Sequence, residues 1–193
     1  MKTIETALKT KAIFSDNGEK RYVLTKTWDE KKPRMAIIML APSVASGVEL
    51  DMSTLLVLNN ASRLGYGSVE ILNLFTRVND FSLKEAEEGD GENLQYIRQV
   101  AESVDTIVYA AGVGKNQNKI FRIRQKVVLK ALSPWEKKLH CLCNANGDAR
   151  LQHPLSPAVR TWHLSSLKIN ELLEENIQTE KEEPKKRKKK IEQ

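Results

Sequence analysis

The sequence has no long apolar run. Its most apolar stretch, residues 35–41, has only the length of a strand, whereas a membrane-spanning helix needs about 20 apolar residues. The first residues include Glu5 and contain no apolar core before a small-residue cleavage site, so we expect no secretory signal. These absences argue against a membrane protein and predict a cytoplasmic one.

Cysteine is also scarce. Cys141 and Cys143 stand two positions apart in a predicted strand, where the geometry does not favour a disulfide, so we expect both thiols to be reduced. A zinc site would need two further ligands. His140 and His153 are near in sequence, but the Cys-x-Cys spacing differs from that of a usual zinc knuckle. We expect no metal and no cofactor.

The remaining composition is that of an ordinary globular chain. Of 193 residues, 40% are hydrophobic and 29% charged, which argues against fibrous and wholly disordered proteins. The length suits one domain with a sizeable core, for which we predict residues 1–178.

The basic charge gathers at the carboxyl end. Residues 179–193 hold seven Lys or Arg against four Glu, which supplies half of the net charge of +6. Such a tail either contacts nucleic acid through phosphates or is a solvated, disordered end. The residues that would make phosphate contacts are Lys185, Lys186, Arg187, Lys188, Lys189 and Lys190.

Strand-like segments alternate with helix-like ones. The predicted strands are 21–27, 35–40, 69–75, 105–110 and 138–143, and the predicted helices are 53–64, 92–103, 120–132 and 164–177. This alternation predicts an α/β domain of three layers, with a mostly parallel central sheet and helices on both faces. In such a sheet a ligand binds outside the carboxyl ends of the strands.

Polar turns follow the apolar strands. Pro42 and Ser43 come after the second strand, Asn73 lies in the third, and Gly112 comes after the fourth. We expect these segments to converge on one ligand site. Lys115 would meet a phosphate there, although its surroundings match neither a Walker loop nor the dinucleotide fingerprint and also suit a plain turn.

Two residues are candidates for catalysis. Asp51 would orient a water or a hydroxyl, and its alternative role is to cap the helix that begins near Ser53. His153 precedes Pro154, which restricts the local backbone, and a neutral imidazole held there would bind a substrate carbonyl or a developing oxyanion. The alternative for His153 is a surface loop histidine.

An ordered series of motifs extends over about residues 20–157. It comprises Arg21-Tyr22 with Trp28, 38–43, Asp51 with Ser53, 65–67, 73–75, Glu92-Asn93, Gly112, and Gly147 with 153–155. In this order the motifs resemble the bacterial and phage domain-of-unknown-function family 1643. The resemblance adds Asn93 to the ligand-binding candidates. This chain has Ala41, Met52 and Ala111 where the family usually has Asn, Pro and Trp, so an activity that depends on the Asn would be lost or altered.

The chain also has a distant similarity to the uracil-DNA glycosylase superfamily. Pro42 and His153-Pro154 correspond to its strand-end and histidine motifs, and its water-activating residue would fall at Ala41. The resemblance implies a parallel α/β fold in which His153 supports a leaving base. Phe75 would stack on a flipped base and Asn73 would read its edge.

Three functions remain open from the sequence. The first is a nucleobase- or nucleotide-recognising protein, which as an enzyme would be a DNA glycosylase-like N-glycosidic hydrolase. Alternatively, it binds and sequesters a nucleotide-like ligand without catalysis, or it is a DNA-binding accessory factor that depends on its tail. The expected partners are nucleic acid or a nucleotide-like ligand, and no membrane.

Overall fold

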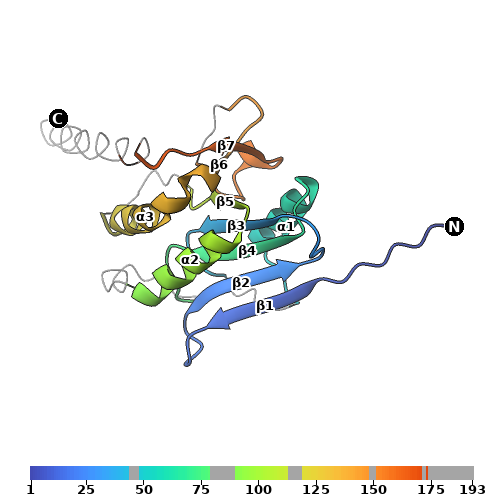
Figure 1. Cartoon of the computed structure of the whole chain (residues 1–193), viewed down its shortest axis with the longest axis horizontal. Helices are drawn as coiled ribbons and strands as arrows, with labels where there is room; N and C mark the ends of the chain where they lie inside the picture. Colours follow the sequence, from blue (N-terminus) through green and yellow to red (C-terminus); the bar gives the residue numbers. More distant parts are fainter. Residues whose placement is uncertain (44–47, 79–89, 113–118, 148–150, 171–172, 174–193) are drawn as a thin grey trace, which may run out of the picture.

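The computed structural model in Figure 1 describes residues 1–43, 48–78, 90–112, 119–147, 151–170 and 173. One sheet holds the strands β1 (Lys9–Phe14), β2 (Arg21–Thr27), β3 (Arg34–Met39), β4 (Ser68–Asn73), β5 (Thr106–Tyr109), β6 (Leu139–Cys143) and β7 (His163–Ser166). The helices are α1 (Met52–Arg63), α2 (Gly91–Ser103) and α3 (Lys119–Leu132), followed by the 3₁₀ segments Ser133–Lys138 and Pro157–Val159. The predicted α/β class is therefore confirmed.

The sheet is mixed, with the strand order β1-β2-β4-β3-β5-β6-β7. The central strands β4, β3, β5 and β6 are parallel, whereas β1 pairs with β2, β2 with β4, and β6 with β7 in antiparallel fashion. The expectation of a mostly parallel sheet thus holds only for the centre. The short turn between β1 and β2, in which Gly18 has a φ of 72°, permits only an antiparallel neighbour.

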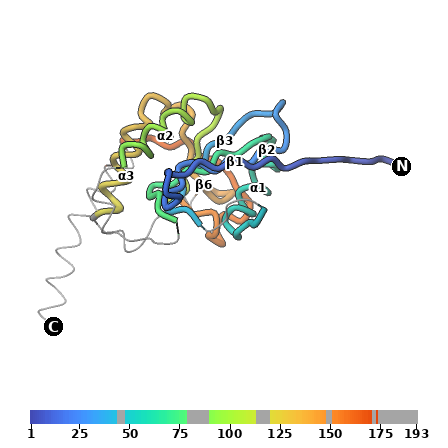
Figure 2. Tube along the Cα trace, turned by 90° about the horizontal axis from the view of Figure 1, so that it is seen from below, coloured from blue at the N-terminus to red at the C-terminus, as the bar shows by residue number. Residues whose placement is uncertain are grey.

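Helices cover both faces of the sheet, as predicted. The face under α2 and α3 contains Ile38, Leu72 and Tyr109 in one buried apolar cluster. The opposite face packs Ile37 and Ile71 against Val57 of α1 in a second cluster. Figures 1 and 2 show α2 and α3 side by side and α1 apart from them. The apolar strands are buried because both faces are covered.

Two parts of the predicted organisation need correction. Strand β1 was not predicted, because most of its side chains are exposed and charged or hydroxylated residues interrupt its apolar pattern. The helix predicted over 164–177 is wrong at its start, where Leu164 lies in β7 opposite Leu142 of β6. Pairing with β6 outweighs the helical spacing of its leucines. Helical geometry begins only at Ile169, and residues 171–172 and 174–193, including the basic tail, lie outside the described residues.

In the parts of the chain that the structure describes, no helix has the length and apolar character needed to cross a bilayer.

Candidate functional site

The carboxyl ends of the central strands lie side by side. Beyond the strands, Leu74 N donates to Met39 O at 2.9 Å and Phe75 N donates to Leu40 O at 3.0 Å. On the other side of β3, Ala110 N donates to Ile38 O at 2.8 Å. The segments that leave β3, β4 and β5 therefore begin at one edge of the sheet, which we call the strand-end rim.

Asp51 and Ser43, both predicted site residues, are in direct contact. Ser43 Oγ donates a short hydrogen bond to Asp51 Oδ2, and Asp51 accepts from Thr54 N at 2.8 Å and from Thr54 Oγ1 at 3.0 Å. Asp51 is thus the N-cap of α1, so the capping role is confirmed. Burial raises the pKa of Asp51, but the hydrogen bonds from Ser43 and Thr54 outweigh burial and hold that pKa below 3.8.

Arg21 lies beside this pair, although we did not predict it as a site residue. Its guanidinium is buried, with the residue only 2% exposed, and Nη1 donates to Ser43 O at 3.3 Å. Burial lowers the pKa of Arg21, and the charge of Asp51 opposes that shift. The available sequence signal was its place in the Arg21-Tyr22 motif of the family series, at the first residue of β2.

His153 reaches the same place from the segment after β6. Its Nδ1 accepts from Leu155 N at 3.2 Å, so the neutral imidazole carries its proton on Nε2. Burial lowers the pKa of His153 from 6.5, and the negative charge of Asp51 opposes the shift. Gly112, which has a φ of 83°, adjoins His153, since a Cβ on this glycine would lie 3.4 Å from His153 Cβ. The structure therefore brings Ser43, Asp51, Gly112 and His153 together.

Asn73 ends β4 and is buried, with 1% of its surface exposed. Alternation along the strand places its side chain on the face of Ile71, which α1 covers. Among the described residues, Asn73 Nδ2 has no hydrogen-bond acceptor. The backbone oxygen of Asn73 accepts from Nδ2 of Asn93 in α2 at 3.0 Å. The side-chain oxygen Oδ1 of Asn93 is buried and has no donor among the residues that the structure describes.

Arg124 of α3 approaches the residue after Asn73. Its Nε donates to Leu74 O at 2.7 Å, and its buried Nη2 has no acceptor in the described ranges. Burial lowers the pKa of Arg124, and the charge of Asp90 opposes the shift. We did not predict Arg124, which lies on the buried side of α3 with Phe121 and Gln125. A charged residue at a buried helical position was the available signal.

Asp90 links α2 to Thr76, which follows β4, and to Lys20, which precedes β2. It caps α2 by accepting from Asn93 N at 3.2 Å, and its Oδ2 accepts from Thr76 Oγ1 at 2.6 Å. Lys20 Nζ lies 3.8 Å from the same oxygen. Asp90 therefore supplies a fixed negative charge beside Arg124.

Of the other predicted site residues, some are described by the structure and some lie outside the described residues. Pro42 is buried, and Phe75 is half-buried and packs against the core under α2 and α3. Lys115 lies outside the described residues, as do the six tail residues Lys185, Lys186, Arg187, Lys188, Lys189 and Lys190.

In the described ranges, no three His, Cys, Asp or Glu side chains lie close enough together to hold a metal ion. Cys141 and Cys143 are buried free thiols. Of the family departures, Ala41 is half-buried, Met52 is exposed as the first residue of α1, and Ala111 is buried.

Comparison with known proteins identifies the family. Neither a curated protein nor a solved structure matched this chain significantly, so the likeness to uracil-DNA glycosylases stays a hypothesis. The sequence model of the family described as "Protein of unknown function (DUF1643)" matches residues 21–155. That span includes Arg21, Asp51, Asn73, Arg124 and His153, and it covers well over half of the chain. The chain belongs to the DUF1643 family.

Proposed function

We propose that the strand-end rim binds a nucleotide-like ligand. The observation that carries this proposal is two buried donors at the end of β4, Arg124 Nη2 on the face of the sheet under α3 and Asn73 Nδ2 on the face under α1, which both lack acceptors among the described residues. A buried donor without an acceptor costs about 1–3 kcal/mol, and more if it is charged. A ligand oxygen at each donor would recover that free energy.

The chemistry of the donors favours a ligand rich in oxygen acceptors. A guanidinium pairs well with phosphate, and a carboxamide suits the edge of a nucleobase. His153 adds an Nε2–H group close to the Asp51 side of the rim. A nucleotide carries phosphate oxygens and base carbonyls at separate ends of one molecule, so it offers acceptors to donors that lie on both sides of the end of β4.

The state of Asp51 favours binding over base excision. A general base needs a free oxygen and a pKa near the working pH. Both carboxylate oxygens of Asp51 already accept hydrogen bonds, and its pKa lies below the ordinary value. Ala41 offers no group that would activate water. We therefore propose ligand binding without hydrolysis as the function of the rim.

A thermal-shift series tests the binding. We expect nucleoside phosphates to raise the melting temperature, because a ligand present at 100 times its Kd stabilises the native state by about 2.7 kcal/mol. Arg124→Met should lose most of this shift. The matched control is Lys126→Met, which removes an exposed cation from the same helix and should keep the shift. No shift of the wild-type protein with any nucleotide would overturn the proposal.

A second assay separates binding from hydrolysis. Labelled DNA with normal, deaminated or modified bases is incubated with the protein and then treated with alkali, which cleaves abasic sites. We expect no strand breaks. Breaks that disappear in His153→Gln would instead establish glycosylase action and refute the non-catalytic form of the proposal.

A further inference from the structure

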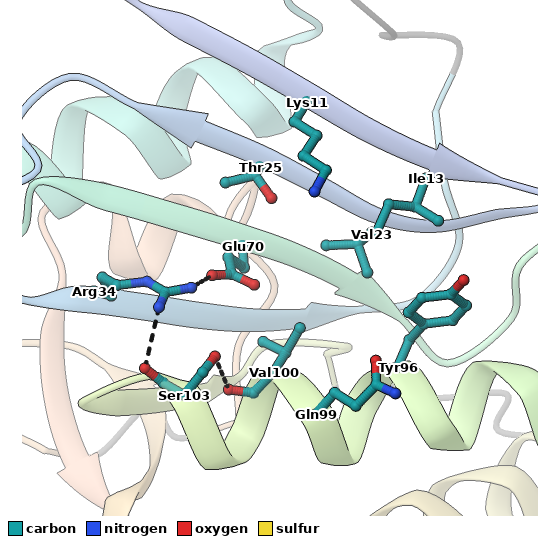
Figure 3. A pocket seen from close by; sticks show the side chains of 10 residues that line it. All are labelled: Lys11, Ile13, Val23, Thr25, Arg34, Glu70, Tyr96, Gln99, Val100 and Ser103. Atoms are coloured by element: carbon teal, nitrogen blue, oxygen red, sulfur yellow. Dashed lines mark hydrogen bonds and ion pairs between the residues drawn. The ribbon is translucent and has the colours of Figure 1, made fainter.

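A pocket of about 310 Å³ lies away from the strand-end rim, between the β1–β2 hairpin and α2 (Figure 3). None of the residues that line it belongs to the site described above. The hairpin contributes Lys11 and Ile13, which face Thr25 and Val23 across the strand pair. We propose that this pocket binds a small organic carboxylate with an aromatic or branched aliphatic body.

The charges of the pocket favour an anion. Glu70 of β4 is only 5% exposed and accepts a short hydrogen bond from Arg34 Nη2, while Arg34 Nη1 donates to Ser103 O at 3.3 Å. These contacts engage the Arg34 guanidinium and neutralise Glu70. Lys11 has no hydrogen-bond or ion-pair partner among the described residues, and Figure 3 shows its ammonium directed into the pocket. The net charge of these three groups is therefore one positive charge, carried by Lys11.

The walls favour an apolar body on that anion. Ile13, Val23 and Val100 line the pocket with aliphatic surface, and Tyr96 adds an aromatic ring. The Tyr96 ring is held by stacking on Tyr22, with centroids 5.0 Å apart. A volume of about 310 Å³ is at the lower end of the range for ligand pockets, so a molecule with one ring or a short branched chain fits within it.

Titration with benzoate, followed by amide NMR shifts, tests this assignment. We expect a Kd on the order of 1 mM, as the small size of the probe allows, with shifts at Val23, Thr25 and Val100. Lys11→Met should weaken binding about fivefold, the upper end for a partly exposed ion pair. The matched control is Lys9→Met in the same strand, because Lys9 pairs with Glu30 at 2.6 Å outside the pocket, and it should bind benzoate as the wild type does.

Three results would overturn the assignment: equal affinity for the neutral isostere benzyl alcohol, wild-type affinity in Lys11→Met, or shifts confined to other parts of the chain. Lys11 is exposed, so its replacement should not impair folding. Thr25→Phe provides a second variant, which should fill the pocket and abolish binding. Arg124→Met should bind benzoate normally, so failure of the strand-end proposal and failure of this one are distinguishable.

Discussion

The side chain of Arg124 donates a hydrogen bond from Nε to the backbone oxygen of Leu74 at 2.7 Å, and this bond ties α3 to the chain where it leaves β4. One residue earlier, Asn93 of α2 donates to the oxygen of Asn73 at 3.0 Å. Both carbonyls at the end of β4 are thus held by helix side chains. The rim is organised before any ligand arrives, which reduces the ordering cost of binding.

Replacement of Asn73 by Leu should separate stability from ligand binding. Asn73 Nδ2 is buried and has no acceptor in the described residues, so an apolar side chain of similar size should change the free energy of unfolding by less than about 1 kcal/mol. The thermal shift caused by nucleotides should disappear. Urea denaturation and the thermal-shift series measure the two effects, and a large loss of stability would show that the amide has a structural role.

The burial of His153 predicts a pH dependence of stability. Because its pKa is lower in the folded protein than the unfolded value of 6.5, the unfolded state takes up the proton first as the pH falls. This contribution to stability is complete above pH 6.5, declines below it, and stops declining once the pH is below the folded pKa. Urea denaturation at about pH 7.5 and about pH 5 should therefore show a smaller decline for His153→Gln than for the wild type. An equal decline in both proteins would contradict the assignment.

Removal of the Asp51 side chain should destabilise α1. Asp51→Ala removes the acceptor of Thr54 N and should lower the free energy of unfolding by about 1–2 kcal/mol near neutral pH. Asp51→Asn keeps a capping oxygen and should lose less. Because the folded pKa of Asp51 is depressed, the ionic part of its contribution is present above pH 3.8 and is lost as the pH falls through the folded value. Equal unfolding free energies for the two variants would refute the capping explanation.

Gly67 should tolerate no side chain. A Cβ at this position would lie 1.9 Å from the backbone oxygen of Asp29, and the same segment is held by Gly67 O, which accepts from Trp28 N at 2.9 Å. Gly67→Ala should therefore cost more than about 2 kcal/mol in chemical denaturation. The matched control is Gly91→Ala at the start of α2, where a Cβ meets nothing within 4 Å and the change should be neutral or slightly stabilising. Wild-type stability of Gly67→Ala would show that this loop moves aside.

Local sequence patterns were sufficient for most of the central elements. The apolar runs around Ile37 and Val108 predicted β3 and β5, because a strand covered on both faces must be apolar along its whole length. Asp51 was a candidate cap of α1 through a capping preference that acts within one turn. The same patterns predicted that the turns with Ser43 and Gly112 lie at one edge of the sheet, since the ends of adjacent parallel strands meet there.

Only the tertiary structure decided the remainder. Strand β1 and the strand character of Leu164 depend on pairing with β2 and β6, and such pairing is a contact between elements that the residue pattern of neither segment alone reveals. The buried guanidiniums of Arg21 and Arg124 donate to backbone oxygens that distant segments supply, Ser43 O and Leu74 O respectively. Hydrophobic periodicity is a local property of the chain and can be predicted from it. Whether a buried polar group has a hydrogen-bond partner depends on the assembled fold, so it cannot be predicted from the local sequence pattern.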